Sequence, residues 1–521
     1  MIDILIKNGL VYDGSLNEPY ISDIALSKDK IGSIGSFNVK DAGLVIEAKG
    51  LAVCPGFIDS HAHSDFTLLA DPRAEGKICQ GITTEINGNC GMSAAPLYNK
   101  ALEKREDDLR QLGISERWNT LKEYFALLSK RGTAVNTAML AGHGNIRGSV
   151  LGYDDREPSS ADLSEMSKLL RSAIEHGAIG LSTGLIYPPG VYAGTEEIIA
   201  LAEILKGSNL IYTSHMRSEG EMLVEAVREV VRIGQETGVR VHVSHIKTSG
   251  ENNWHKADEV IELLLEAKSK GIMATCDRYP YIASGTDLDS ILPSWAYDGG
   301  NEEEIKRLQI GAERAKMKQG MKASTDQWKK IIISSVAKEK NKWMEGKTIS
   351  DICKELKTDE TDFVFDLLIE EKLRVGAIFL SMNEKNLAKF LSLPFCMIGT
   401  DSSARSFDGP TRTGKPHPRG FGSFPKFFGK YVREEKLMPL STAVNRSTLL
   451  PASTFGLKGR GMIKEGMFAD IVVFSPEKIK DNATFEDPFQ KPEGIYYVLV
   501  NGTPAVYEGK PTGKLAGRIL T

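Results

Sequence analysis

Eight short apolar segments with the character of β-strands recur along the middle of this chain, and most of them are separated by a segment with a helical pattern. In chain order they are residues 51–63, 81–89, 135–144, 178–186, 210–216, 239–246, 272–281 and 394–402. The helical segment 221–238 ends at a glycine, which is a common stop signal. Eight alternating β/α units predict an α/β fold of the (β/α)8 TIM-barrel type. The alternative is an open, doubly wound parallel sheet.

The two ends of the chain are instead rich in short strands and turns. "LIKNG" near the N-terminus and "YVLVNG" near the C-terminus each place an apolar strand before Asn-Gly, which is a strong hairpin signal. Two such flanks can pair into one unit with the rest of the chain inserted between them. We therefore predict a small β-sandwich domain built from residues 1–54 and 455–521, and a barrel domain of residues 55–454.

The interval between the seventh and eighth strands is too long for a simple loop. It includes the charged helical stretch 302–324, "EEEIKRLQIGAERAKMKQGMKAS". Long connections inside a compact domain usually carry function or structure of their own. The sequence thus predicts an insertion after the seventh strand, at about residues 285–345, near the mouth of the barrel.

Charge and cysteine content exclude several classes of protein. The net charge is −4, so no basic field is available to recruit nucleic acid. Six cysteines without paired spacing do not make a disulfide framework. No apolar run reaches the length of about 18 residues that spans a membrane, and the N-terminus shows no signal-peptide pattern. We expect a cytoplasmic protein that binds a small molecule, with no nucleic-acid or membrane partner.

Histidines follow several of the predicted strands, at the end where a TIM barrel carries its active site. His61 and His63 are two residues apart, so in an extended segment both rings face the same way. His215 continues the inward row of the fifth strand. His143 ends the third strand and faces the site, where contact with a ligand and simple packing are both open.

The sixth and eighth strands add two more candidates. Alternation places Val241, Val243 and His245 on the inward face, and leaves His242 on the other face as a packing or surface residue. Asp401 shares the inward face of the last strand. A single histidine at a strand end is usually structural, but several on the inward register indicate a metal site.

Cys90 lies in the turn "NGNCG" after the second strand. A cysteine there can be a buried small hydrophobe, a nucleophile, half of a disulfide or a metal ligand. The residues around Cys90 leave these four possibilities open.

These motifs resemble a known family. "PGFIDSHAHSD", two strands with a single histidine and a late strand ending in Asp are similar to the amidohydrolase superfamily. "NGNCGMSAAP", "GLSTGLIYPPG", "SHMRSEG", "HVSHIKTSG" and "HPRGFGSFP" resemble more narrowly its D-aminoacylase branch, the N-acyl-D-amino-acid deacylases. The resemblance covers essentially the whole chain. It implies hydrolysis of N-acyl-D-amino acids to a carboxylate and a free D-amino acid.

The resemblance also implies a set of metal ligands. Many binuclear amidohydrolases bridge their metals with a carboxylated lysine on the fourth strand, but "AIGLSTGLIY" contains no lysine. Cys90 stands where the D-aminoacylase branch uses a cysteine instead. By the same likeness, Cys90, His215 and His245 form a tight zinc site, and His61 and His63 are ligands of a second, weaker site, whose occupancy the resemblance leaves open. Zn²⁺ suits this mixed thiolate and imidazole set better than Mg²⁺ or Ca²⁺.

The same likeness assigns roles in catalysis and binding. Asp401 resembles the proton shuttle for a zinc-bound hydroxide, taking a proton during attack and giving one to the leaving amine. Arg419 in "HPRGFG" matches the arginine that binds the substrate carboxylate. Lys247, Tyr187 and Tyr281 resemble further substrate contacts, and His143 completes the candidate set.

Three other functions remain open. A cyclic amidase such as a hydantoinase or dihydroorotase shares the scaffold, but the bridging lysine and the absence of "GNCG" would mark it. A D-aminopeptidase or dipeptidase could use the same site. A metal-free binding module would have lost ligands, whereas all five candidates and Asp401 are present.

Overall fold

The computed structural model describes residues 2–321 and 327–521. Residue 1 of the predicted β domain therefore lies outside the described residues. So do residues 322–326, which belong to the predicted insertion and to the end of the helical stretch 302–324.

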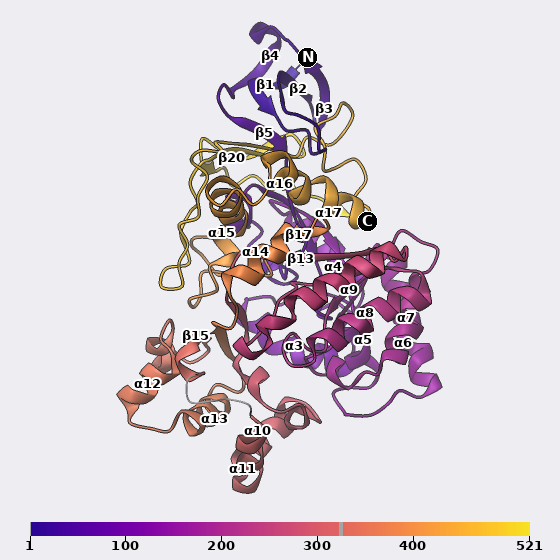
Figure 1. Cartoon of the computed structure of the whole chain (residues 1–521), viewed down its shortest axis with the longest axis vertical. Coiled ribbons are helices and arrows are strands. Elements are labelled where there is room, and N and C mark those ends of the chain that lie inside the picture. The colour runs from indigo at the N-terminus through magenta and orange to yellow at the C-terminus, as the bar shows by residue number, and fades with distance from the viewer. Residues whose placement is uncertain (1, 322–326) are drawn as a thin grey trace.

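A barrel of parallel strands occupies the centre of the molecule (Figure 1). Its strands are β6 (Phe57–Asp59), β7 (Ile82–Asn87), β8 (Asn136–Met139) with β9 (Ala141–Gly142), β10 (Gly180–Gly184), β11 (Ile211–His215), β12 (Arg240–Val243), β13 (Ala274–Arg278) and β17 (Cys396–Ile398). Neighbouring strands pair in parallel from β6 to β8 and from β9 to β17. The ring closes where Ser60 N–H donates to the Ile398 carbonyl, 3.3 Å away. The predicted TIM barrel is confirmed.

Helices surround the barrel between these strands. They include α3 (Asn99–Gln111), α4 (Leu121–Arg131), α5 (His143–Val150), α6 (Ser160–Glu175), α7 (Thr195–Ala202), α8 (Leu223–Thr237), α9 (Ala257–Ser269), α14 (Glu384–Ser392), α15 (Arg419–Lys426), α16 (Leu440–Ser447) and α17 (Leu449–Thr454). Capping boxes begin two of them: Thr120 with Glu123 at α4, and Ser159 with Asp162 at α6. Gly238, in the left-handed region at φ 70°, ends α8 as predicted. In the described part of the chain, no helix is both long and apolar enough to cross a membrane.

Strand residues alternate between two apolar layers. Tyr212, Val241 and Val243 belong to the large core between barrel and helices. Ile58 and Ile211 belong to a separate cluster that includes residues of α17, and we identify this cluster as the barrel interior. The alternation positions side chains at the ends of the strands, where the site lies.

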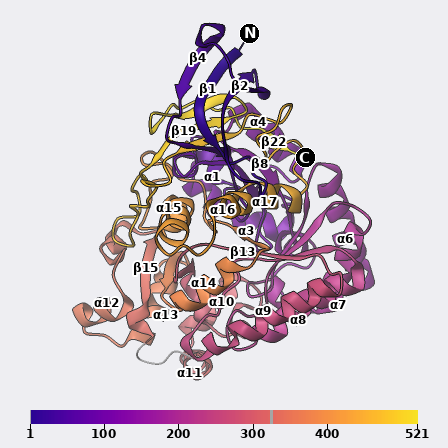
Figure 2. The same cartoon turned by 45° about the horizontal axis from the view of Figure 1, so that its top comes forward.

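Strands from both ends of the chain form one nine-stranded sheet above the barrel in Figures 1 and 2. They are β1 (Ile2–Val11), β2 (Tyr20–Ser27), β3 (Lys30–Gly35), β4 (Ala42–Glu47), β5 (Ala52–Pro55), β18 (Ile471–Phe474), β19 (Ile495–Val500), β20 (Thr503–Tyr507) and β21 (Lys510–Pro511). The last strand, β22 (Ile519–Leu520), instead pairs with barrel strand β8. The division of the chain at residues 54/55 and 454/455 stays our proposal.

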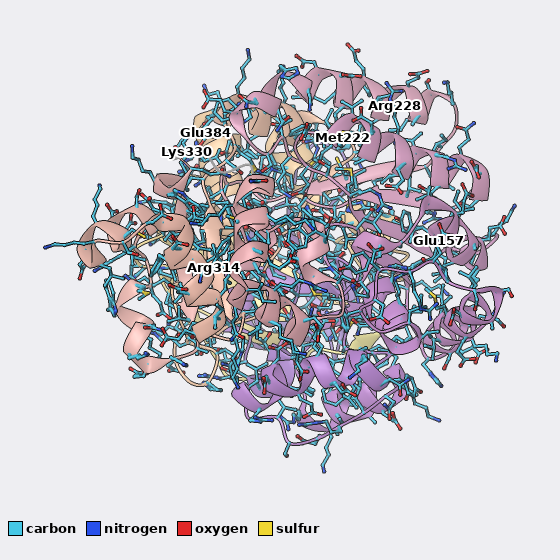
Figure 3. The ribbon with its side chains drawn as sticks, turned by 90° about the horizontal axis from the view of Figure 1, so that it is seen from below. Glu157, Met222, Arg228, Arg314, Lys330 and Glu384 are labelled. Atoms are coloured by element: carbon cyan, nitrogen blue, oxygen red, sulfur yellow. The ribbon has the colours of Figure 1, made fainter. Side chains whose placement is uncertain are left out.

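The insertion after β13 folds around a small sheet and a core of its own. Its elements are β14 (Ser284–Asp287), α10 (Asn301–Gln309), α11 (Gly311–Gly320), β15 (Ile331–Val336), α12 (Ile349–Leu356), α13 (Glu360–Glu370) and β16 (Val375–Phe379). It therefore runs from Ser284 to Phe379, further than the predicted 285–345, because β16 forms the centre of the sheet. Seen from below in Figure 3, it is marked by Arg314 and lies beside the barrel helices, marked by Arg228.

Candidate metal centre

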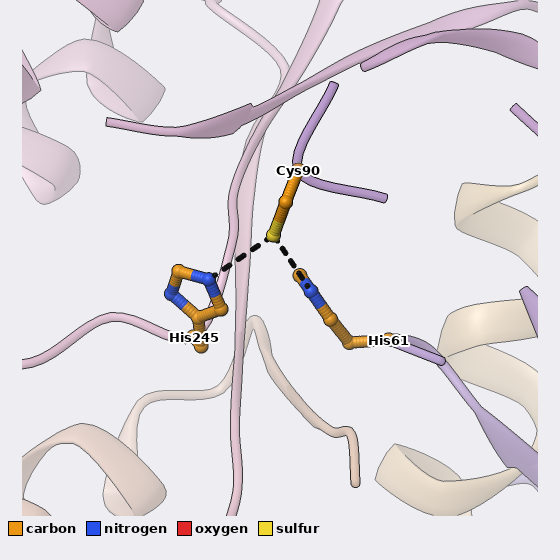
Figure 4. A group of neighbouring side chains, drawn as sticks. All are labelled: His61, Cys90 and His245. Carbon is orange, nitrogen blue, oxygen red and sulfur yellow. Dashed lines mark hydrogen bonds between the residues drawn. The ribbon is translucent and has the colours of Figure 1, made fainter. Parts of the chain in front are cut away.

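Cys90 lies at the centre of a cluster of histidines. Its Sγ is 3.3 Å from Nε2 of His61 and 3.4 Å from Nε2 of His245 (Figure 4). All three side chains are buried. The ligand atoms of this group lie within 4.8 Å of one another, close enough to share one metal ion.

The backbone around Cys90 explains the "GNCG" motif. Cys90 adopts the left-handed region at φ 55°, which costs a residue with a side chain about 1–3 kcal/mol. The loop also presses against β10, because a Cβ on Gly184 would lie 2.1 Å from the Cys90 carbonyl oxygen. Asp65 fastens the same loop by accepting N–H bonds from Ala94 (3.0 Å) and Gly88 (3.4 Å). These contacts aim the thiol into the barrel.

Two further groups of ligand atoms flank this cluster. Oδ1 of Asp401 lies 3.2 Å from Nε2 of His63 and 3.7 Å from Nε2 of His61. His215 groups with His245 and Glu219 on the other side. The structure thus brings together all five predicted ligands and Asp401.

Carboxylates orient two of the rings. Oδ2 of Asp277 lies 3.1 Å from Nδ1 of His61. Oε1 of Glu219 lies 2.9 Å from Nδ1 of His245, and Lys247 pairs with the same carboxylate. Where Nδ1–H is donated to a carboxylate, as at His61, Nε2 is the nitrogen left to bind a metal, which is the usual arrangement around metal-bound histidines.

The cluster favours an ionised sulfur. Burial opposes ionisation of Cys90, but the imidazoles of His61, His245, His215 and His63 outweigh it and hold the thiol pKa well below its usual value. Burial lowers the pKa of His215 and so favours the neutral form of its ring, which is the form that binds metals.

Asp401 is also kept ionised. Burial alone would raise its pKa, but Arg419, followed by His245, His63 and His61, holds the pKa well below the usual range. The backbone of Asp401 is in the left-handed region at φ 49°. The ionised carboxylate beside the cluster is the form that can accept a proton.

The residues fit a thiophilic divalent cation. Both ring nitrogens of His215 are buried without a hydrogen-bond partner in the described part of the chain, as expected of a metal ligand. One thiolate with imidazole nitrogens is a donor set that Zn²⁺ prefers. Asp401 and Glu219 add oxygen donors at the two sides.

A cavity of about 1360 Å³ opens above this centre, between the barrel loops and the insertion. Cys90, His215 and Asp401 form part of its floor, and β14, β15 and β16 supply part of its wall. This volume accommodates a substrate considerably larger than a single acetyl amino acid.

Three predicted substrate contacts line this cavity. Nη1 of Arg419 forms an ion pair with Oδ2 of Asp401 at 2.8 Å, while its Nε and Nη1 lack a directed hydrogen bond among the described residues. The Tyr187 hydroxyl lies 3.0 Å from Oγ1 of Thr286 in the insertion. Lys247 reaches the cavity beside His245.

Two other predicted contacts are corrected, because neither lines the cavity. The Tyr281 hydroxyl donates to Asp481, at a distance of 3.2 Å. His143 is fully buried at the start of α5, with Nε2 2.8 Å from Glu197. Both side chains are therefore occupied in packing around the site.

The predicted register of the sixth strand is also wrong. His242 points into the barrel, where its Nε2 lies 2.7 Å from Asp277, while Val241 and Val243 face the outer helices. His245 reaches the site because β12 ends at Val243 and the chain then turns, with His245 at φ 36°.

Sequence reasoning missed three residues of the site. Asp277 had no motif of its own, although it lies on the inward register of β13. Glu219 follows His215 by four residues in "SHMRSEG", which was a usable signal. His417 lines the cavity, and its Nδ1 accepts the backbone N–H of Arg419 at 3.0 Å.

Comparison with known proteins adds family information. A model of the amidohydrolase family matches residues 44–203 and 399–506. The chain is 35% identical to a D-aminoacylase of Alcaligenes xylosoxydans xylosoxydans over 518 residues, covering 99% of this chain and 97% of that protein.

Solved structures agree. One is the N-acyl-D-glutamate deacylase of Bordetella bronchiseptica, complexed with zinc and a phosphonate inhibitor, with a TM-score of 0.85 and 32% identity over 100% of this chain and 99% of the other. A D-aminoacylase crystal structure gives a TM-score of 0.84 at 32% identity, covering 100% of both chains.

Proposed function

The chain belongs to the amidohydrolase family, and on that premise we propose that it cleaves the amide bond of N-acyl-D-amino acids in a zinc-dependent reaction. The products are a carboxylate and a free D-amino acid. The relatives named D-aminoacylase, N-acyl-D-glutamate deacylase and N-acyl-D-aspartate deacylase support this substrate class.

One observation carries the proposal: the Cys90 sulfur lies between histidine Nε2 atoms whose Nδ1 atoms are held by carboxylates. We assign Cys90, His215 and His245 to a tight zinc site, and His61 and His63 to a second, weaker one. When bound, zinc activates a water for attack and polarises the amide carbonyl.

Asp401 is the group that moves the proton. Its Oδ1 faces His61 and His63, so it lies beside the proposed ions. As an ionised carboxylate it accepts a proton from the attacking water and passes it to the amine nitrogen as the C–N bond breaks. An amine leaves readily only when protonated, so one carboxylate serves as base and then as acid.

Arg419 is the anchor for the substrate carboxylate. Its side chain lines the cavity beside Asp401; Nη1 is ion-paired with that carboxylate, while Nε has no hydrogen-bond partner among the described residues. An arginine binds a carboxylate through two parallel hydrogen bonds, which fixes the orientation of the amino acid. A substrate carboxylate bound to Arg419 also partly neutralises the guanidinium charge that holds the Asp401 pKa down. Substrate binding therefore raises the Asp401 pKa and makes it a better base.

The test is release of free amine from paired N-acetyl-D- and N-acetyl-L-amino acids with zinc-loaded enzyme. The panel contains Met, Leu, Phe, Glu and Asp, and Asp401→Asn prepared in parallel controls for contaminating deacylases. Release from D members alone is expected. Equal release from L members would contradict the D preference. No release from any member would contradict the proposed substrate class and favour cyclic amides or dipeptides instead.

A further inference from the structure

Arg278, the last residue of β13, is a buried cation without an acidic partner among the described residues. Its side chain is 1% exposed. Nη2 donates to the Tyr281 carbonyl at 2.7 Å and contacts Sδ of Met382 at 2.9 Å. Nε and Nη1 meet no acceptor in the described part of the chain. Since arginine stays protonated in proteins, this positive charge is buried.

A small cavity of about 10 Å³ lies beside the guanidinium. Lys247, Thr248, Met382, Asn386 and Phe390 are among the residues that line it. It is separate from the large cavity, with which it shares only Lys247 as a lining residue. A space of this size holds one water molecule or one monatomic ion.

Donors predominate around this cavity, although Asn383 and Asn386 each also carry an amide oxygen, that of Asn383 accepting the Asn386 backbone N–H at 2.8 Å. Both N–H bonds of the Asn386 amide are used, toward Thr248 Oγ1 (3.0 Å) and the Trp254 carbonyl (2.7 Å). Thr248 therefore accepts from Asn386 and keeps its own O–H to donate. Lys247 adds a second positive charge, although Glu219 pairs with it. Among the residues that the structure describes, no carboxylate lines the cavity.

The Arg278 guanidinium lies over the Tyr279 ring, 4.1 Å from its centroid, which compensates part of its charge. Full pairing needs an anion, because removal of a charge from water costs several kcal/mol per ion. A water molecule can accept hydrogen bonds from Arg278 but brings no charge. A halide ion accepts the same bonds and supplies the missing negative charge.

We propose that this cavity binds a chloride ion, held by Nε and Nη1 of Arg278 and by the Thr248 hydroxyl. The site is independent of the proposed hydrolase activity. It adjoins the metal centre, since Arg278 follows Asp277 and Lys247 lies 2.8 Å from Nδ1 of His245. Bound chloride therefore stabilises the end of β13 that carries Asp277.

The direct test is anomalous diffraction from wild-type crystals grown in sodium bromide. A bromide peak within hydrogen-bond distance of both Nε and Nη1 of Arg278 is expected. An ordered water there, with no anomalous signal, would overturn the proposal. This experiment needs no variant and so does not depend on folding of a mutant.

Thermal unfolding supplies the second test. The midpoint is measured in sodium chloride, sodium bromide and sodium gluconate at one ionic strength, since gluconate is too large for the cavity. The midpoint should rise with halide concentration in the wild type, as for any ligand of the folded state, and not in Arg278→Met.

Arg446→Met is the matched control. Arg446 is also buried, but its guanidinium donates to the carbonyls of Leu391 and Ser392 and does not line the cavity. Its midpoint should keep the halide dependence. Equal midpoints in all three salts for the wild type would refute the site.

Discussion

Lys77 is fully buried behind the metal centre and makes the most demanding prediction of this structure. Its Nζ lies 2.8 Å from Oδ2 of Asp59 and 2.8 Å from Oε1 of Glu85. It also donates to Oγ1 of Thr400 at 2.8 Å and to the Ser402 carbonyl at 2.9 Å. One ammonium thus joins the ends of β6, β7 and β17, which carry the site.

Lys77→Met keeps most of the volume but removes the only cation that this pair of carboxylates contacts among the described residues. Breaking a buried ion pair by removing one partner costs about 3–5 kcal/mol, because the other charge stays buried and unpaired. Here two carboxylates lose their partner, so we expect a loss of stability at the upper end, about 5 kcal/mol. Glu85→Gln removes one of those charges and should restore part of it in the double variant.

Urea unfolding of the wild type, both single variants and the double variant forms a double-mutant cycle. We expect Lys77→Met to lower the free energy of unfolding much more in the wild-type background than in the Glu85→Gln background. A loss below about 1 kcal/mol for Lys77→Met, the size of an exposed ion pair, would contradict a buried pairing of Lys77 with both carboxylates. So would a double variant less stable than Lys77→Met alone.

Three further predictions concern the site. Asp401→Asn should keep its zinc but lose about 10²–10⁴-fold in turnover, and a metal-loaded variant with normal turnover would remove Asp401 from the reaction. Gly184→Ala, whose Cβ would lie 2.1 Å from the Cys90 carbonyl oxygen, should lower zinc content and thermal stability, whereas Gly194→Ala, which meets nothing within 4 Å, should not. Asp277→Asn should weaken zinc binding about 10–100-fold in a competition with a chelator, and unchanged affinity would show that Asp277 does not orient its histidines.

The barrel was predictable from sequence because it follows from the number and spacing of its strands. The join of both chain ends in one sheet was also visible, through the Asn-Gly turns. Pairing of β22 with β8 was not, because Ile519 and Leu520 carry no local signal for a partner nearly 400 residues away. The extent of the insertion was missed for the same reason: β16 is defined by its neighbours in space.

Site residues could be predicted where they end a strand. The prediction of side-chain direction was wrong where the strand ends before the site residue. His215 is the last residue of β11, so period-two alternation placed it correctly. His245 lies beyond the end of β12, and its left-handed backbone breaks the alternation. The predicted substrate contact of Tyr281 could not be assessed from sequence, because its hydroxyl donates to Asp481, a contact set by the packing of distant segments.

The central claim, that Cys90 holds a catalytic zinc among histidines, is tested most directly by zinc K-edge X-ray absorption on the zinc-loaded enzyme. One sulfur at about 2.3 Å from the zinc is expected, with nitrogen and oxygen neighbours at about 2.0–2.2 Å. The sulfur should be lost in Cys90→Ser. A wild-type spectrum with nitrogen and oxygen neighbours alone, or one that Cys90→Ser leaves unchanged, would contradict it.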